Sequence, residues 1–525
     1  MSGLTRADWK GVGQGHKYER LPSAPCPGET SLPTDVHEKI QPIFDHHLSS
    51  FRSSKRHHLA IMSMGVIGAL LCLYWVMGAY SSSHFQGCDS VDQGFQCQPE
   101  ISHFWGQYSP YFSVQSPSQI ATDVPDQCRI TFAQILSRHG ARDPTLTKTL
   151  KYMQIIEFVH TNAKSYSKDY RFIKDYKYTL GADELTIFGQ QQMINSGTKF
   201  YERYQSLALH ATPFIRASGQ NRVVESAQNW TQGFHDSRIQ NDPSKPDEYP
   251  YDILVIPETT GSNNTLSHGL CDSFEDGSDS TGDNAQNGWM EIFAPPITTR
   301  LMENLPGVNF TNEDTIYMMD LCPFNTIASD SGKISPFCGL FTEAEWHAYD
   351  YYQSLGKYYG YSWGNPLGPT QGVGFTNELI ARLTNNPVND HTSTNSTLDS
   401  SEKTFPLGGN TSLYADFSHD NDMITIFSAL GLYNATKSLS NTTIEDVEKT
   451  NGYSASWTGP FAARAYFEKM TCGSAEEEFV RVIVNDRVLP LETCGGDELG
   501  RCTLAAFVDS LSFARQGGDW DKCFT

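Results

Sequence analysis

The sequence predicts an α/β fold in which a sheet carries polar clusters at its strand ends and a smaller helical domain is inserted. Two apolar runs, residues 130–136 and 413–417, are typical of buried strands, and each is followed by a polar cluster and then a helix-like pattern. Strand, polar loop and helix in this order are expected at the carboxyl edge of an α/β sheet. Helix-like patterns without a neighbouring strand, at residues 185–204 and 341–359, predict the inserted helical part.

The composition is that of a globular protein with an acidic surface. The chain has 525 residues, of which 38% are hydrophobic, and this is enough for a large core in one domain or two. Its formal net charge is −22. An acidic chain has no basic surplus to neutralise a nucleic-acid backbone, so nucleic acid is excluded as a general partner and any phosphate binding must be local.

The N-terminal part predicts a tail and a membrane anchor. Residues 1–58 are polar and without periodicity, which indicates a disordered cytosolic tail. Residues 59–80 are uncharged, mostly apolar and long enough to span a bilayer as one transmembrane helix. Arg52, Lys55 and Arg56 precede this run and no Lys or Arg follows until Arg129, so we expect a single-pass type II signal anchor with a lumenal or extracellular C-terminal part. The alternative is a signal peptide that is cleaved near residues 79–81, which would give a secreted protein.

The remainder divides into a stalk or wrapping segment at residues 81–127 and a catalytic body at residues 128–525, in which residues 262–287 are expected to form an exposed loop.

Cysteines and glycosylation sequons both occur mainly after the predicted anchor, as expected for a protein of the secretory pathway. Ten of the twelve cysteines follow it: Cys88, Cys97, Cys128, Cys271, Cys322, Cys338, Cys472, Cys494, Cys502 and Cys523. Seven sequons follow it as well, at Asn229, Asn263, Asn309, Asn395, Asn410, Asn434 and Asn441.

The most informative segment is residues 138–144, which follows the first predicted strand. It places His139 between Arg138 and Arg142, with Asp143 and a proline after them. Guanidinium groups bind a phosphate group bidentately, and a neutral imidazole between them can attack phosphorus. The segment therefore predicts a phosphate pocket with its own nucleophile, and the alternative is a solvated turn.

A second polar cluster, residues 418–421, follows the strand at residues 413–417. His419 is a candidate donor to a phosphate oxygen, and Asp420 is a candidate acid for the leaving oxygen. The alternatives are that Asp420 caps a helix, or that His419, Asp420 and Asp422 bind a metal, although their spacing is not that of a zinc site. A third segment, residues 214–223, carries Arg216 and Arg222, one of which would complete the phosphate cage unless both belong to a salt-bridged strand end.

Together the three segments resemble the histidine acid phosphatase family, most closely its fungal phytase branch. The resemblance extends from about Cys88 to the C-terminus and includes residues 364–374 and 517–520. It implies a histidine-phosphatase-like α/β sheet domain with an inserted helical domain, with His139 as the nucleophile and Asp420 as the proton donor. It also implies phosphate binding by Arg138, Arg142, Arg216 and His419. The disulfides that it implies are Cys88–Cys97, Cys128–Cys472, Cys271–Cys523, Cys322–Cys338 and Cys494–Cys502.

The chain departs from fungal phytases at three points. Asp143 stands where such phytases usually have an aromatic residue, and a carboxylate there is expected to weaken phosphate binding or to shift its pH dependence. Gly356 and Lys357 stand where some have adjacent lysines, so one positive charge is missing. Relatives of this kind are also typically secreted, whereas residues 59–80 would tether this chain.

We therefore expect a phosphomonoester hydrolase, a phytase or acid phosphatase, that works without a metal or cofactor through a phosphohistidine intermediate. The first-choice substrate is phytate (inositol hexakisphosphate) at acidic pH. Lys174, Lys177 and Lys357 are candidates for holding its outer phosphates, and the alternative is that they are solvated surface lysines. One alternative is an acid phosphatase of broad specificity, and another is an inactive surface glycoprotein that binds phosphorylated ligands.

Overall fold

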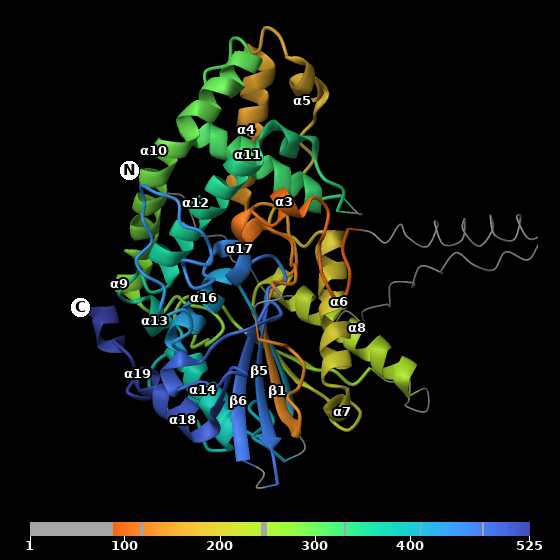
Figure 1. The fold of residues 1–525 in the computed structure, drawn as a ribbon, viewed down its shortest axis with the longest axis vertical. Coiled ribbons are helices and arrows are strands. Elements are labelled where there is room, and N and C mark those ends of the chain that lie inside the picture. Colours follow the sequence, from red (N-terminus) through yellow and green to blue (C-terminus); the bar gives the residue numbers. More distant parts are fainter. Residues whose placement is uncertain (1–87, 116–119, 243–248, 330–331, 410, 475–476) are drawn as a thin grey trace, which may run out of the picture. The chain divides into compact units, whose positions relative to one another are not determined.

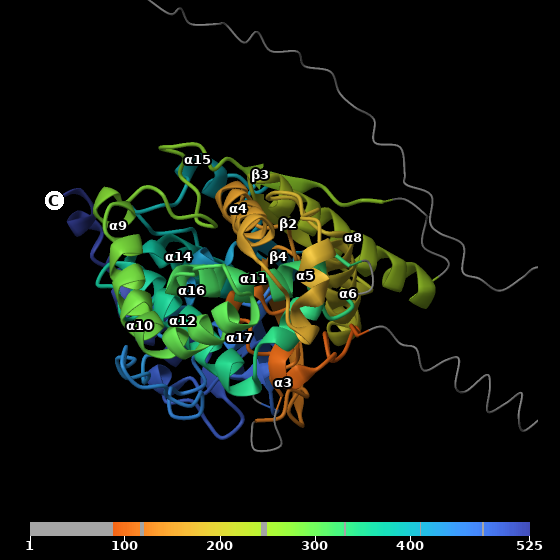
Figure 2. The same cartoon turned by 90° about the horizontal axis from the view of Figure 1, so that it is seen from above.

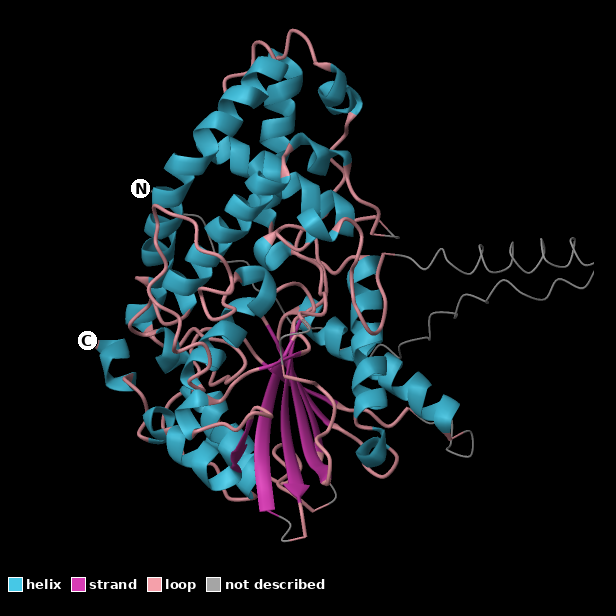
Figure 3. Cartoon of the chain, viewed as in Figure 1, coloured by secondary structure: helices cyan, strands magenta, loops and turns pink. Residues whose placement is uncertain are grey.

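A mixed eight-stranded sheet forms the base of the fold (Figures 1 and 3). The computed structural model describes residues 88–525 except 116–119, 243–248, 330–331, 410 and 475–476. The strand order is β3-β2-β4-β1-β5-β6-β7, with β8 paired to β6. The strands are β1 (Cys128–Arg138), β2 (Phe214–Ser218), β3 (Ile253–Ile256), β4 (Leu413–Ser418), β5 (Arg464–Cys472), β6 (Glu477–Val484), β7 (Arg487–Val488) and β8 (Arg501–Thr503). Strands β1 to β4 pair with one another in parallel, and every pairing that involves β5, β6, β7 or β8 is antiparallel.

Helices pack on both faces of this sheet. On one face lie α6 (Ile187–Arg203), α7 (Gln205–Ala208) and α8 (Asn221–Asn241), whose Phe200 and Trp230 share a buried cluster with Ala133 and Ile135 of β1. On the other face, Phe132 and Leu136 of the same strand point into a second cluster. This alternation along β1 is what a central strand buried on both faces requires. Besides the helices of the helical part, the helices that follow β3 in the chain are α13 (Gly368–Gln371), α14 (Val373–Thr384), α15 (Ser396–Asp399), α16 (Asp420–Ala429), α17 (Ala455–Thr458), α18 (Leu504–Ser510) and α19 (Ser512–Arg515).

The helical part is continuous with the second of these cores. It consists of α4 (Leu146–Asn162), α5 (Arg171–Asp175), α9 (Asp272–Glu275), α10 (Ser278–Asn304), α11 (Asn312–Ile327) and α12 (Glu343–Tyr361) (Figure 2). Buried side chains of α4 and α12, among them Tyr152 and Trp346, belong to the same cluster as Leu136 of the sheet, whereas Phe274 of α9 packs in a small separate cluster with Cys271 and Cys523. The helical part is therefore packed onto the sheet as one hydrophobic core.

Two local predictions need correction or refinement. The expected loop at residues 262–287 ends in helix, because α9 and the first turns of α10 fall within it. Its polar composition reflects the exposed side of α10, whereas Trp289 and Phe293 further along the same helix are buried. Within the expected stalk or wrapping segment, α3 (Pro99–Ser102) is followed by Trp105, which is fully buried, and Phe95 is buried as well. These described residues pack against the domain.

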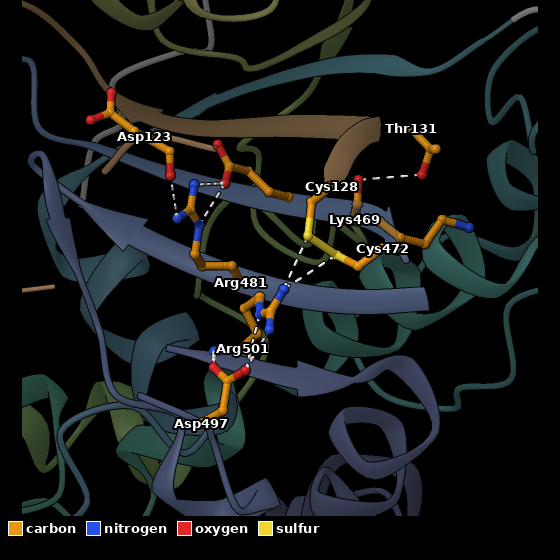
Figure 4. Close-up of a disulfide and its surroundings, with 9 residues drawn as sticks. Asp123, Cys128, Thr131, Lys469, Cys472, Arg481, Asp497 and Arg501 are labelled. Atoms are coloured by element: carbon orange, nitrogen blue, oxygen red, sulfur yellow. Dashed lines mark hydrogen bonds and ion pairs between the residues drawn. A yellow bond between two sulfur atoms is a disulfide. The ribbon is translucent and has the colours of Figure 1, made fainter. Parts of the chain in front are cut away.

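The disulfides are the five that the family resemblance implies, which confirms that expectation. Cys128–Cys472 joins the first residue of β1 to the last residue of β5, which are paired in the sheet (Figure 4). Arg501 of β8 lies over this bond, with Nη1 3.0 Å from Sγ of Cys128, and is itself held by Asp497 at 2.8 Å. The bridge therefore ties the chain at the end of the sheet opposite to the carboxyl ends of β1 and β4.

The predicted tail at residues 1–58 and anchor at residues 59–80 lie outside the described residues. Within the described part of the chain, no helix is both long and apolar enough to cross a membrane. Among the sequons, Asn410 is also outside the description, whereas Asn263, Asn309, Asn434 and Asn441 are exposed. Asn229 and Asn395 are half-buried, and the side chain of Asn395 caps α15.

Candidate active site

The register of the parallel strands brings four segments to one edge of the sheet. Arg138, the last residue of β1, is paired with Ser418 at the end of β4, and Ser218 at the end of β2 is paired with Ile256 at the end of β3. The strand ends are thus level, and the residues that follow them emerge together. These are the segments that begin at His139, Gly219, Pro257 and His419. The predicted clustering of the first and second motifs follows directly from this register.

The turn after β1 is held by close backbone packing against α6. A Cβ on Gly140 would lie 2.3 Å from the carbonyl oxygen of Gly189, and one on Gly189 would lie 1.9 Å from that of Ala141. Only glycine fits at either position, because backbone atoms cannot move aside as a side chain can. The hydroxyl of Ser226 accepts from the Gly140 amide at 3.1 Å, so α8 also fixes the turn.

His139 is buried, and its ring has a defined orientation. Its Nδ1 lies 2.8 Å from the carbonyl oxygen of Gly140, an oxygen that can only accept a hydrogen bond. Nδ1 therefore carries the proton, and Nε2 keeps its lone pair. Burial, together with the charges of Arg138 and Arg142, holds the pKa of His139 well below its ordinary value. The imidazole is consequently neutral and nucleophilic even at acidic pH.

Arg138 and Arg142 lie near enough to this ring for their charges to lower its pKa. Arg138 donates to the carbonyl oxygen of Gly459 at 2.8 Å, lies over the Phe461 ring at 4.4 Å and has a pKa that burial lowers to about 10. It therefore stays charged at any acidic or neutral pH. Arg142 donates to the backbone oxygen of Asp143 at 2.8 Å, and its charge lowers the pKa of His139.

Arg216, the third predicted phosphate ligand, is placed elsewhere, which corrects that assignment. It lies inside β2 opposite Asp416 and bonds that carboxylate at 2.8 Å and Glu378 at 2.7 Å. Two carboxylates neutralise it within the core, so it has no charge left for a ligand. Arg222, the other arginine of the same segment, lies in the first turn of α8, and its charge acts on His139, Arg142 and Asp420.

Asp420 begins α16 and is enclosed by cations. Its Oδ1 lies 3.4 Å from Nη2 of Arg138, and its Oδ2 lies 2.5 Å from Nζ of Lys357. Burial alone would raise the pKa of Asp420, but these two charges hold it well below its ordinary value. The candidate acid is thus a carboxylate as long as no ligand competes for its partners.

His419 has a partner that the sequence motifs do not include. Its Nε2 lies 2.9 Å from Oε1 of Glu258, and its ring centre lies 5.5 Å from that of His139. Glu258 comes two residues after β3, the one parallel strand at this edge without a candidate in the predictions. The one feature of the sequence that could indicate Glu258 as a site residue is its position just after a strand. A single acidic residue after a four-residue strand is too common to be informative.

A cavity of about 580 Å³ borders the site through Lys357 and Asn421 rather than through His139 itself. The helical part supplies most of its wall, including the basic residue Lys148, which the sequence did not single out. Lys357 both lines this cavity and bonds Asp420, so it connects the cavity with the reaction centre. The acidic residues Asp283, Glu313 and Asp320 also line it.

The remaining specificity candidates, Asp143, Lys174 and Lys177, are not among the described residues that line the cavity. The carboxylate of Asp143 accepts from the backbone of Gly181, so it holds the chain before α6. Burial raises the pKa of Asp143, and the hydrogen bond with Gly181 and the charge of Arg142 oppose this rise. Lys174 and Lys177 are exposed.

Comparison with known protein families identifies the class of protein to which this fold and site belong. Residues 129–485 match the family described as histidine phosphatase superfamily (branch 2), and the chain belongs to this family of phosphoric monoester hydrolases. The family resemblance given above is thereby confirmed.

Comparison with individual proteins indicates a narrower group within this family. The chain is 52% identical to a phytase A of Aspergillus oryzae over 88% of this chain and 100% of the relative. It is 52% identical to a phytase A of Aspergillus fumigatus over 86% of this chain and 96% of the relative. A solved phytase of D. castellii shares the fold, with a TM-score of 0.66 at 23% identity over 81% of this chain and 87% of that one.

These relatives correct the predicted localisation. They match along 96% and 100% of their own length, and fungal phytases, as the resemblance already implied, are typically secreted. The prediction of a type II membrane protein is therefore wrong. A lumenal or extracellular catalytic domain agrees with the five disulfides.

Proposed function

We propose that the protein releases phosphate from phytate at acidic pH through a phosphohistidine formed on His139. The observation that carries this proposal is the state of His139, whose Nδ1 is tied to Gly140 and whose Nε2 is left as a nucleophile among arginines. A histidine that is neutral in acid and surrounded by positive charge suits attack on a bound phosphate group.

The first step is in-line attack of Nε2 of His139 on phosphorus. Arg138, Arg142 and Arg222 are the proposed phosphate ligands, because all three act on this ring electrostatically. His419 is the fourth, at a ring-centre distance of 5.5 Å. Their charges stabilise the transferring group in the transition state, where positioning and electrostatics supply most of the acceleration.

Asp420 is the proposed proton donor to the leaving oxygen. In the free site Arg138 and Lys357 keep it ionised. A bound phosphate group brings negative charge beside Asp420 and competes for these cations, and both effects favour the protonated acid. After the alcohol leaves, Asp420 is a carboxylate again and is placed to accept a proton from the water that hydrolyses the phosphohistidine.

The relatives and the cavity support phytate as the substrate. Both phytase A relatives are about half identical to this chain. The cavity of about 580 Å³ has the size of a small-molecule site and carries Lys148 and Lys357. A second candidate, broad phosphomonoesterase activity, is favoured by the three carboxylates in the same wall and by the absence of a side chain at Gly356.

The test is an assay of the full chain at acidic pH with phytate and with an aryl phosphate. We expect higher kcat/KM for phytate; equal values would favour broad specificity. Substitution His139→Ala should abolish both activities while circular dichroism stays unchanged. A labelled phosphoenzyme that is stable in alkali and labile in acid should form in the parent protein, and its formation by His139→Ala would refute the assignment.

A further inference from the structure

The two histidines of the site are held by acceptors of different charge. Nδ1 of His139 faces the neutral backbone oxygen of Gly140 at 2.8 Å. Nε2 of His419 faces the carboxylate of Glu258 at 2.9 Å. The two rings are neighbours and lie in the same electrostatic environment. The charge of the hydrogen-bond acceptor is therefore a feature that distinguishes them.

Glu258 is present as a carboxylate. Its side chain is only 14% exposed. Burial alone would raise the pKa of Glu258, but the hydrogen bond and charge of His419, a hydrogen bond with Ser218 and the charge of Arg222 hold it below its ordinary value. The residue is therefore ionised through most of the acidic range, and its nearest ionic partner is His419.

The position of Glu258 is fixed by the sheet. It follows β3, whose last residue, Ile256, is paired with Ser218 of β2. A Cβ on Gly219 would lie 2.9 Å from the carbonyl oxygen of Ile256, so the chains after these strands run in close contact. The carboxylate is thus delivered to His419 by the same register that aligns the two catalytic motifs.

A histidine has two donors only as an imidazolium ion. In a neutral ring that donates from Nε2 to Glu258, Nδ1 is an acceptor and would repel the oxygens of a phosphate group. A carboxylate partner stabilises the second proton, and the ring can then donate from Nε2 to Glu258 and from Nδ1 to phosphate.

We propose that Glu258 is a positioning residue for phosphoryl transfer: it orients His419 through Nε2 and keeps this ring an imidazolium, so that Nδ1 donates to the transferring phosphate. This inference rests on the proposed function. It assigns the two neighbouring histidines opposite protonation states, His139 neutral as nucleophile and His419 charged as donor.

The other charged groups around His419 are less suited than Glu258 to stabilise a second proton on this ring. Asp422 of the same helix interacts with His419, but it accepts from the backbone amide of His268 at 2.6 Å, and burial raises its pKa. His139, on the β1 side, is neutral. Arg222, from α8, adds positive charge near Glu258 and so opposes a second proton on the ring.

The experiment compares pH profiles of phytate hydrolysis for Glu258→Gln and the parent full-length protein. The amide keeps an acceptor for Nε2 but removes the charge. We expect kcat/KM to fall about ten- to hundredfold at the upper end of the active pH range, and less than about threefold at its lower end, where bulk protons charge His419. The alkaline limb therefore moves to lower pH. A profile lowered by the same factor at every pH, or an unchanged one, would overturn the proposal.

A matched control is Glu275→Gln, which alters a second close carboxylate–histidine pair among the described residues, Glu275 with His268 at 2.7 Å. Its profile should follow that of the parent. If the parent hydrolyses neither phytate nor an aryl phosphate, the proposed function fails; if the parent is active and Glu258→Gln matches it, only this inference fails.

A direct measurement covers the case in which Glu258→Gln does not fold. The parent protein is labelled with ¹⁵N-histidine, and the ring signals of His419 are assigned by their loss in His419→Gln. Two protonated ring nitrogens at the pH of highest activity are expected. A neutral ring at that pH would refute the inference without use of the variant.

Discussion

Two groups of buried and half-buried arginines lie at the same sheet and differ in how their charge is balanced. Arg216 and Arg382 face Asp416 at 2.8 and 2.7 Å, and Arg216 also bonds Glu378 at 2.7 Å. The charges of Arg138, Arg142 and Arg222 act on His139, and the carboxylates paired with this group are Asp420, 3.4 Å from Arg138, and Asp183, 3.7 Å from Arg222. The first group is neutral as a whole, and the second keeps a surplus of positive charge.

This difference separates a structural cluster from a binding site. A buried ion pair whose members satisfy each other has nothing to offer a ligand, however many arginines it contains. Even the acidic neighbour Asp399 fits this pattern, because burial and the charge of Glu378 raise its pKa to about 7, so it adds little charge in acid. A surplus of buried cations, in contrast, is stabilised when an anion binds.

The largest effect is expected from Asp420→Asn, which removes the carboxylate from the positively charged group. Hydrolysis of phytate should fall by up to about 10⁴-fold, because the amide cannot protonate the alkoxide. An aryl phosphate, whose leaving group needs little protonation, should lose much less. Steady-state kinetics on both esters check this, and an equal loss on both would contradict the role of Asp420 as leaving-group acid.

Arg222→Met should reduce kcat/KM for both esters by about 10²- to 10³-fold, the effect of losing one donor to the developing charge. Because Arg222 is half-buried and its ion pair with Asp183 is long, at 3.7 Å, the midpoint of urea unfolding should change little. Inhibition by inorganic phosphate should weaken in parallel. Unchanged kinetic constants would show that Arg222 does not bind the phosphate group.

Arg216→Met reverses this pattern. It leaves Asp416 and Glu378 buried without their shared partner, and we expect the free energy of unfolding to fall by about 3–5 kcal/mol. The protein that remains folded should keep most of its kcat/KM. Urea unfolding and active-site titration separate the two readouts. A kinetic loss like that of Arg222→Met, with stability unchanged, would show that Arg216 contacts phosphate after all.

The contrast between these two arginines marks where sequence reasoning ends. Both stand in one segment of ten residues, and a strand pattern followed by arginine suits either of them. The partners that neutralise Arg216 come from β4 and α14, about 160 to 200 residues further along the chain. Charge balance inside a fold depends on such distant contacts, which a local motif does not contain.

The strand-end motifs could be predicted because their chemistry is local. Residues 138–143 and 418–420 carry the proposed nucleophile, the cations and the proposed acid within a few positions, and the apolar runs before them identify the strands. Glu258 and Lys148 could not be found in this way, because an acid after a short strand and a lysine on a helix are ordinary until tertiary contacts give them partners. Lys357 was expected to hold an outer phosphate, whereas its contact with Asp420 arises only from the packing of α12 beside α16.

The smallest effect concerns the cavity, where positive charge is less dominant than around His139. A Cβ on Gly356 would lie 2.7 Å from the side-chain amide of Gln286, a flexible group that can move aside and gives up its hydrogen bond with the Tyr352 carbonyl. Gly356→Lys therefore fits after this adjustment and adds a cation beside Lys357. We expect KM for phytate to fall about two- to fivefold relative to Gly356→Ala, which carries the Cβ without the charge. The gain should shrink with added salt and be absent for an aryl phosphate, since screening and the lack of outer phosphates both remove the interaction. Equal KM values for the lysine and alanine variants would mean that outer phosphates do not reach this wall, and the surplus charge that binds substrate would then be confined to the group around His139.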